Sequence, residues 1–151
     1  TEITKAALKP HLLEDLLIDG KAFDSQSEKM QAAKVVVTKA NFGCGSSREH
    51  AVWAFEVNDI NVVIAESFAR IFRQNMFNCG ILVIEFPAAD IHALFAMKGN
   101  LDIDVDINAG NIRAKSDDAS QDDFDCSFTL NEYDKNLVGA GGWLAFADAN
   151  Y

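Results

Sequence analysis

The chain has 151 residues, of which 49% are hydrophobic and 24% charged, and its formal net charge is −10. That size and apolar content suffice for one hydrophobic core, and no break in composition divides the sequence, so we expect a single domain over residues 1–151. The acidic balance disfavours nucleic acid and anionic membrane surfaces as partners, because either polyanion would be repelled. An anionic ligand must therefore be held by a local site.

The cysteines are widely spaced: Cys44, Cys79 and Cys126 form no Cys-x-x-Cys pair. We therefore expect that this chain binds no metal and that its thiols are reduced, as in cytoplasmic proteins. No apolar run approaches the roughly 20 residues of a membrane span, and residues 1–10 lack the apolar centre of a signal peptide. These features predict a soluble, cytoplasmic protein.

The first third of the chain combines a helical pattern with a strand. Residues 5–18 place leucines at roughly helical spacing and predict a first helix, broken at Pro10. Residues 25–29 are polar and predict a surface loop. A short β-branched run at 34–38 predicts a buried strand, and the apolar stretch 51–57 predicts the next helix.

The middle of the chain alternates strands and helices. Apolar strand patterns occur at 61–65 and 81–86. Ser67 is expected to cap the helix that follows the first strand, and Pro87 to open a helix over 88–97 after the second. The predicted apolar faces of these helices are Phe68, Ile71, Phe72 and Met76 in the first, and Ile91, Leu94 and Phe95 in the second. This alternation predicts an α/β fold with a mostly parallel sheet.

The last third has the character of an antiparallel sheet. Residues 101–107 alternate strictly between apolar side chains and aspartates, which predicts a strand with one wet face. Residues 112–115 are expected to pair back as a hairpin, and 124–129 form a further candidate strand. The acidic run 117–125 predicts a solvated loop, and Asn131 is expected to cap a short helix. We therefore expect an additional C-terminal β region.

The segment between the strand predicted at 34–38 and the helix predicted at 51–57 concentrates groups that can bind an anion. Residues 41–50 read Asn-Phe-Gly-Cys-Gly-Ser-Ser-Arg-Glu-His. The glycines let the backbone approach a ligand closely, and a helix start offers unpaired N–H groups. Arg48 can bind a carboxylate through two hydrogen bonds, and the hydroxyl of Ser46 or Ser47 remains for proton transfer. The pattern favours a small carboxylic acid, since the lysine of a phosphate-binding loop is absent.

The same residues also fit other interpretations. Ser46-x-x-Glu49 matches a capping box, which would make the turn a structural helix start, although a cap requires only one serine and no arginine. Cys44 could act as a thiolate nucleophile with His50 as its base. Asn41 could orient the turn through its side chain. Spacing alone does not decide between these roles.

Residues 41–51 and 63–72, followed by Asn75, closely resemble the swivelling domain of the aconitase superfamily. Within it they are most similar to the small subunits of 3-isopropylmalate dehydratases. The joint presence of Gly-Ser-Ser-Arg-Glu-His and Ser-Phe-Ala-Arg-Ile-Phe makes the resemblance specific, and it extends from about residue 34 to 86, more loosely to the C-terminus. It implies a β/β/α swivelling domain and a hydro-lyase of leucine biosynthesis, which interconverts 2-isopropylmalate and 3-isopropylmalate by dehydration and rehydration.

The resemblance also implies roles for individual residues and a partner. Ser46 matches the base that removes a proton next to a carboxylate, and Ser47, Arg48 and Gly45 match the substrate-binding group. The residues expected to support the turn are Asn41, Gly43, Cys44, Glu49 and His50. The substrate would be a small dicarboxylic hydroxy acid. The [4Fe–4S] cluster would belong to a separate large subunit, in a heterodimer or heterotetramer, so the isolated chain is expected to be inactive.

One part of the family pattern is not seen. Asp-Thr-Asp and Ile-Ile-Pro elements stand near the N-terminus of such small subunits, followed by a substrate-reading loop, and Thr1 is expected to fall beyond them. Substrate choice therefore stays open between isopropylmalate and the substrates of homoaconitases or of citraconate and methylmalate hydro-lyases. A non-catalytic module that binds anions or assists assembly is the alternative from a different class.

Overall fold

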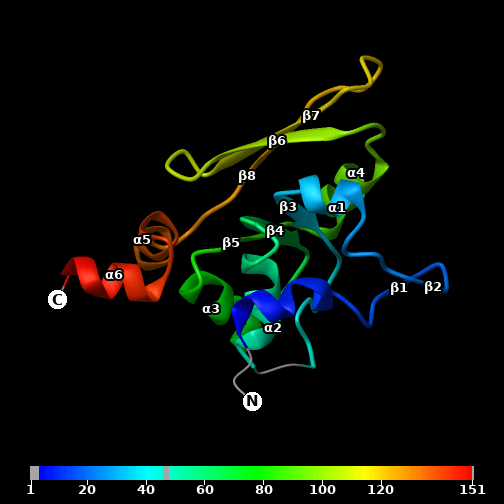
Figure 1. The fold of residues 1–151 in the computed structure, drawn as a ribbon. Helices are drawn as coiled ribbons and strands as arrows, with labels where there is room; N and C mark the ends of the chain where they lie inside the picture. Colours follow the sequence, from blue (N-terminus) through cyan, green and yellow to red (C-terminus); the bar gives the residue numbers. More distant parts are fainter. Residues whose placement is uncertain (1–3, 46–47, 151) are drawn as a thin grey trace.

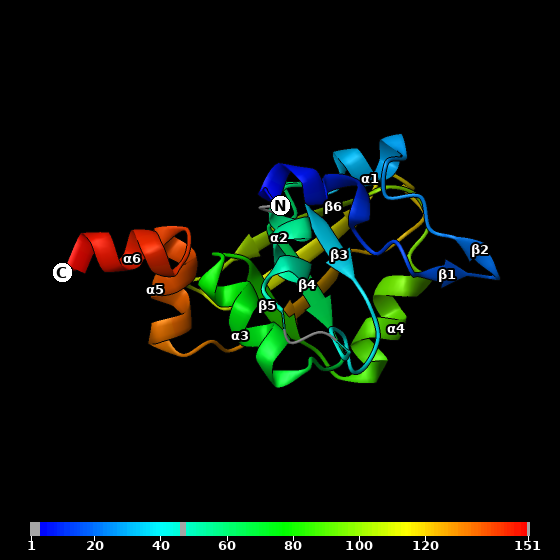
Figure 2. The same ribbon diagram turned by 60° about the horizontal axis from the view of Figure 1, so that its bottom comes forward.

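The computed structural model describes residues 4–45 and 48–150, which stack in layers (Figures 1 and 2). The middle layer is a parallel sheet in the order β3-β4-β5. Its strands are β3 (Val35–Val37), β4 (Val62–Ala65) and β5 (Leu82–Glu85). Val63 pairs with Val36 on one side and with Val83 on the other. The apolar runs at 34–38, 61–65 and 81–86 thus form the predicted parallel sheet, although β3 is half-buried and not the buried strand that was predicted.

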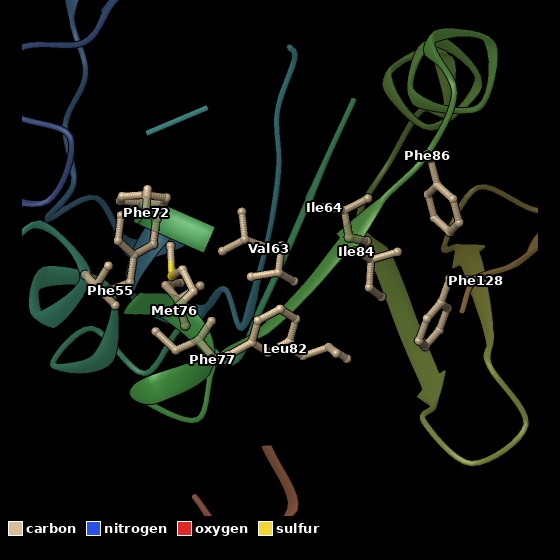
Figure 3. Packing of buried hydrophobic residues seen from close by; sticks show 14 of the residues in the cluster. Phe55, Val63, Ile64, Phe72, Met76, Phe77, Leu82, Ile84, Phe86 and Phe128 are labelled. Carbon is tan, nitrogen blue, oxygen red and sulfur yellow. The ribbon is translucent and has the colours of Figure 1, made fainter. Parts of the chain in front are cut away.

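Helices α2 (His50–Glu56) and α3 (Arg70–Asn78) cover one face of this sheet (Figure 1). Their contribution to the core includes Phe55, Phe72 and Phe77, all at most 3% exposed. Ile84, Phe86 and Phe128 lie on the opposite side of the strands (Figure 3). Because both faces of the parallel sheet are covered, its strands are apolar except for the exposed Glu85 at the end of β5.

The other covering layer is an antiparallel sheet in the order β6-β7-β8. Its strands are β6 (Leu101–Asp106), β7 (Asn111–Ser116) and β8 (Phe124–Ser127). In β6, Ile103 and Val105 are half-buried while the aspartates between them are exposed. Ile103 pairs with Ala114 and Val105 with Ile112, and both β7 partners are fully buried. The expected C-terminal β region is confirmed, and the fold is an α/β domain of β/β/α layering.

The first helix predicted over residues 5–18 is wrong beyond its first turns. A 3₁₀ helix, η1 (Lys5–His11), contains Pro10, which has no N–H to donate to a longer helix. The chain then passes Leu13 at φ 54° and forms a hairpin of β1 (Leu17–Ile18) and β2 (Lys21–Ala22). The leucines at helical spacing therefore lie in an irregular segment, which the fully buried Leu12 anchors to the core.

The polar segment 25–29 is also more ordered than a surface loop. Ser25 is 6% exposed, and its hydroxyl donates to the Pro10 carbonyl at 3.3 Å. Helix α1 (Glu28–Ala32) begins within the segment. The buried amide of Asn58 donates to the carbonyls of Lys9 at 2.9 Å and Ala54 at 2.7 Å. These bonds hold the N-terminal segment against α2.

Three helices complete the fold: α4 (Ala88–Ala96), α5 (Glu132–Ala140) and α6 (Trp143–Asn150). The predicted cap at Asn131 is confirmed, since its side chain accepts from the Asp134 N–H at 2.8 Å. Helix α6 was not predicted, and with α5 it packs beside α3 (Figure 1). Two side chains of the predicted apolar faces are instead about half exposed: Ile71 and Phe95.

Candidate active site

The glycine-rich turn begins where the parallel strands end. Because β3 and β4 are parallel, their carboxyl ends meet at one edge of the sheet, where open α/β sheets commonly bind ligands. The chain after β3 continues beside the chain after β4: the Phe42 N–H donates to the Ser67 carbonyl at 3.0 Å, and the Ala69 N–H to the Phe42 carbonyl at 2.8 Å. The two sequence blocks that carry the family resemblance are therefore in contact.

Ser67 has a different role from the predicted helix cap. The N-cap position of α3 is Ala69, which forms no side-chain cap bond. The Ser67 hydroxyl oxygen instead accepts the Asn41 N–H at 2.9 Å. Asn41 has φ 58°, a left-handed conformation that asparagine tolerates. The turn is thus joined to the second block through the backbone of Asn41, a contact that local sequence patterns do not reveal.

Gly43 is required by packing as well as by conformation. It has φ 80°, and a Cβ at this position would lie 2.1 Å from Cγ of Phe72. Phe72 cannot easily retreat, since it is 3% exposed and its ring packs edge-on against Phe42 at 5.5 Å. Gly45, at φ 112°, faces open space. The first glycine of the turn therefore lets it pack closely on α3, and the second gives it conformational freedom.

Ser46 and Ser47, the predicted base and its neighbour, lie outside the described residues. The predicted capping box begins at Ser46 and therefore also lies outside the described residues. Helix α2 starts at His50, and Glu49 occupies its N-cap position without a side-chain cap bond. A box begun at Ser46 would instead place Glu49 at the third helical position. The Glu49 carboxylate lies 4.0 Å from Cys79 Sγ.

The cysteines near the turn differ in character. Cys79 is half-buried, and burial, followed by the nearby carboxylates of Glu56 and Glu49, raises its pKa to about 12. It is therefore a neutral thiol at physiological pH. Cys44 is exposed, but within the described residues no hydrogen bond joins it to His50, whose ring instead lies 4.6 Å from that of Trp53. The described residues therefore show no hydrogen bond that would support Cys44 as a nucleophile with His50 as its base.

A hollow of about 660 Å³ opens beside the turn, between it and the N-terminal segment. Cys44, Arg48 and His50 line one side. Leu8, Leu13 and Leu16 contribute to the other. Arg48 is an exposed residue. The leucines alternate there with His11, Glu14 and Asp15, so the hollow combines a cationic group with a wall of mixed polarity. The predicted helix over residues 5–18 did not anticipate this wall.

The residues present do not fit an iron–sulfur cluster, which is held by cysteine thiolates. Across residues 4–45 and 48–150, no group of three or more His, Cys, Asp or Glu side chains is arranged to hold a metal ion. Cys126 contacts Asp90, with 3.6 Å between Sγ and Oδ2, and burial and this carboxylate raise its pKa. Within the same described residues, no helix is long and apolar enough to cross a membrane.

Comparison with known proteins gives the class of protein. The family model of the aconitase C-terminal domain matches residues 17–89, a range that includes the turn. A 2,3-dimethylmalate dehydratase small subunit from Eubacterium barkeri is 32% identical over 142 residues, which are 94% of this chain and 78% of the relative. A 3-isopropylmalate dehydratase small subunit from Dechloromonas aromatica (strain RCB) is 58% identical over 67 residues, 44% of this chain and 32% of the relative.

A solved structure agrees with these relatives. The crystal structure of a 3-isopropylmalate dehydratase from Methanocaldococcus jannaschii superposes with a TM-score of 0.59 and 30% identity, covering 76% of this chain and 63% of that one. The chain thus spans about a third of the Dechloromonas relative and less than two thirds of the solved chain. It belongs to the family of dehydratase small subunits built on the aconitase C-terminal domain. The resemblance read from the two motifs is confirmed.

Proposed function

We propose that this chain is the small subunit of a two-chain hydro-lyase of leucine biosynthesis. The enzyme would interconvert 2-isopropylmalate and 3-isopropylmalate by removing and re-adding water. The observation that carries the proposal is the contact between the two family motifs at the carboxyl edge of the parallel sheet. Arg48, from the first motif, is also among the residues that line an open hollow. The relatives named as dehydratase small subunits support the same reaction class.

The chemistry assigned to this chain is carboxylate binding and proton transfer. The guanidinium of Arg48 binds a substrate carboxylate, helped by Ser47 and the backbone at Gly45. Ser46 Oγ, as an alkoxide, accepts the proton from the carbon next to that carboxylate. The electron pair forms a carbon–carbon double bond, and the C–O bond of the neighbouring carbon breaks to release hydroxide. Addition of water to the alkene in the opposite sense gives the isomer.

An ordinary serine hydroxyl is a very weak base, so the alkoxide requires a stabilising environment. The positive charge of Arg48 supplies part of it, and its effect grows where water is excluded. The hollow at the turn is open to solvent in this chain, so a partner surface must close it. The remaining turn residues hold the backbone in place: Asn41, Gly43, Cys44, Glu49 and His50.

The partner is proposed to be a larger cytoplasmic subunit that carries the [4Fe–4S] cluster, in a heterodimer or heterotetramer. Because the cysteines of this chain do not fit a cluster, the part of the reaction that depends on iron is assigned to that subunit. The substrate is a small dicarboxylic hydroxy acid, for which Arg48 provides a carboxylate contact.

A second candidate is a related hydro-lyase with another alkyl-substituted malate, as the name of the Eubacterium barkeri relative suggests. The N-terminal wall of the hollow, which carries Leu8, Leu13 and Leu16 together with the carboxylates of Glu14 and Asp15, favours an alkyl substituent over a third carboxylate. Homoaconitase substrates, which carry a third carboxylate, are therefore less well matched, whereas citraconate-type substrates carry a methyl group and only two carboxylates. A non-catalytic anion-binding module would share the fold but yield no turnover.

The test is anaerobic co-purification with a candidate cluster-bearing large subunit, followed by assays with 3-isopropylmalate, 2,3-dimethylmalate and homoaconitate. We expect no turnover by the isolated chain and the highest kcat/KM of the pair with an alkylmalate. Turnover by the isolated chain would overturn the two-chain assignment. A stable pair that turns over none of these acids would favour the assembly module.

A further inference from the structure

The start of the turn is anchored by two acceptors on one residue. The Ser67 hydroxyl oxygen accepts the Asn41 N–H at 2.9 Å, and the Ser67 carbonyl accepts the Phe42 N–H at 3.0 Å. A parallel bridge between Phe42 and Phe68 continues the contact. Successive N–H groups of the turn are therefore tied to the segment that follows β4.

The hydroxyl contributes something that the backbone bonds do not. Asn41 sits at φ 58°, outside the strand and helix regions, so the bond to Ser67 restrains the residue at which the chain changes direction. Phe42 and Gly43, which follow, pack against Phe72. With both ends of this short stretch fixed, the turn leaves the sheet in one direction.

Loss of this bond is expected to displace the turn more than it destabilises the fold. Asn41 is exposed, so water can satisfy its N–H when the hydroxyl is removed, and the backbone bonds of Phe42 and Ala69 remain. Catalysis tolerates displacement poorly, because a shift of about 1 Å can reduce the rate on the order of 100-fold.

We propose that Ser67 is a positioning residue for the turn, and that its hydroxyl, by accepting the Asn41 N–H, holds the turn in the orientation required for proton transfer. This inference rests on the proposed function for its effect on turnover. It assigns Ser67 no contact with the substrate.

The test compares Ser67→Ala with Ser67→Thr in the reconstituted two-chain enzyme. We expect Ser67→Ala to lower kcat about 10- to 100-fold while KM and the melting temperature change little, and Ser67→Thr, which keeps an acceptor oxygen, to restore most of kcat. The matched control is Ser116→Ala, because the Ser116 hydroxyl oxygen also accepts a backbone N–H at 2.9 Å, that of Asp118, but in the antiparallel sheet. It should leave kcat unchanged.

A kcat for Ser67→Ala within about threefold of wild type would overturn the proposal. So would equal losses in the alanine and threonine variants, since the hydroxyl would then not be the group that matters. If Ser67→Ala fails to fold, Ser67→Cys, whose sulfur is a weak acceptor, takes its place, and it should lose kcat that the threonine variant retains.

Amide hydrogen exchange in the isolated chain separates this proposal from the proposed function. In Ser67→Ala, the Asn41 N–H should exchange about tenfold faster or more, while the Ala69 N–H, bonded to the Phe42 carbonyl, changes little. Unchanged exchange at Asn41, or equal acceleration at both amides, would refute the anchoring role. A wild-type pair that turns over no hydroxy acid would refute the proposed function, and the exchange experiment would still decide the role of Ser67.

Discussion

Gly43→Ala is expected to be the most destabilising glycine substitution in the turn. Two costs add at this position. A residue with a Cβ at φ 80° carries a left-handed strain of roughly 1–2 kcal/mol. The new methyl group would also lie 2.1 Å from Cγ of the buried Phe72 ring, and overpacking of this kind costs about 1–3 kcal/mol. We therefore expect a total loss of about 2–5 kcal/mol in the free energy of unfolding.

The assay is urea unfolding of the isolated chain, with the free energy of unfolding extrapolated to water. Gly20→Ala is the matched control, because Gly20 has φ 76° and no atom within 4 Å of its ideal Cβ. It should lose only the conformational cost, about 1–2 kcal/mol. Gly45→Ala, at φ 112° in open space within the same turn, tests whether the location rather than the contact matters.

The reasoning requires Gly43→Ala to exceed both controls by at least about 1 kcal/mol. If the three alanine variants lost the same amount, the contact between the turn and Phe72 would not restrain Gly43. If Gly45→Ala lost as much as Gly43→Ala while Gly20→Ala did not, the turn as a whole would be sensitive, and the close approach to Phe72 would not be the cause.

Further predictions concern the thiols and the cap of α5. Cys44 is exposed and Cys79 is a half-buried thiol with a pKa of about 12, so a thiol reagent should modify Cys44 first; equal labelling by peptide mass spectrometry would contradict this. The folded chain keeps the Cys79 proton that the unfolded chain loses near its ordinary pKa of 9.0, so the free energy of unfolding should fall as the pH rises from 9 towards 12. Urea titrations across this range should show a smaller decline in Cys79→Ala. Asn131→Ala should lower stability by about 1–2 kcal/mol in thermal unfolding, because it removes the cap and the amide that donates to Asp134; Asn131→Ser, which can still cap, should lose less.

The parallel sheet could be predicted because its physical cause is local. Short β-branched runs, as at residues 34–38, separate clearly from the helices between them. The strand over 101–107 could be predicted equally well, since its alternation of aspartates and apolar side chains matches the pleat of a β-strand. The Asn131 cap has a local signature as well. In these elements, neighbouring residues carry most of the information.

The errors lie where distant contacts decide. The leucines of residues 5–18 fit a helix, but Pro10 and the burial of Leu12 favour an irregular path over α2. A serine before a helix looks the same whether it caps that helix or accepts a hydrogen bond from a distant turn, so the role of Ser67 required the structure.

The candidate site could likewise be predicted from the sequence only in part. The motif over 41–50 identified the family, and the structure brings it into contact with the second motif. The roles assigned to Ser46, Ser47 and Arg48 follow from the family resemblance and stay proposals. The N-terminal wall of the hollow could not be anticipated, because it depends on the non-helical path of that segment.

The most direct test of the central claim is the initial rate of the reconstituted pair with 3-isopropylmalate and 2,3-dimethylmalate, for wild type and Ser46→Ala. The account predicts turnover by wild type, a loss in Ser46→Ala on the order of 1,000-fold or more, and unchanged assembly and melting temperature. Activity within a few-fold of wild type, together with a lower melting temperature, would show that Ser46 only begins a helix and would contradict the assignment of the turn as catalytic.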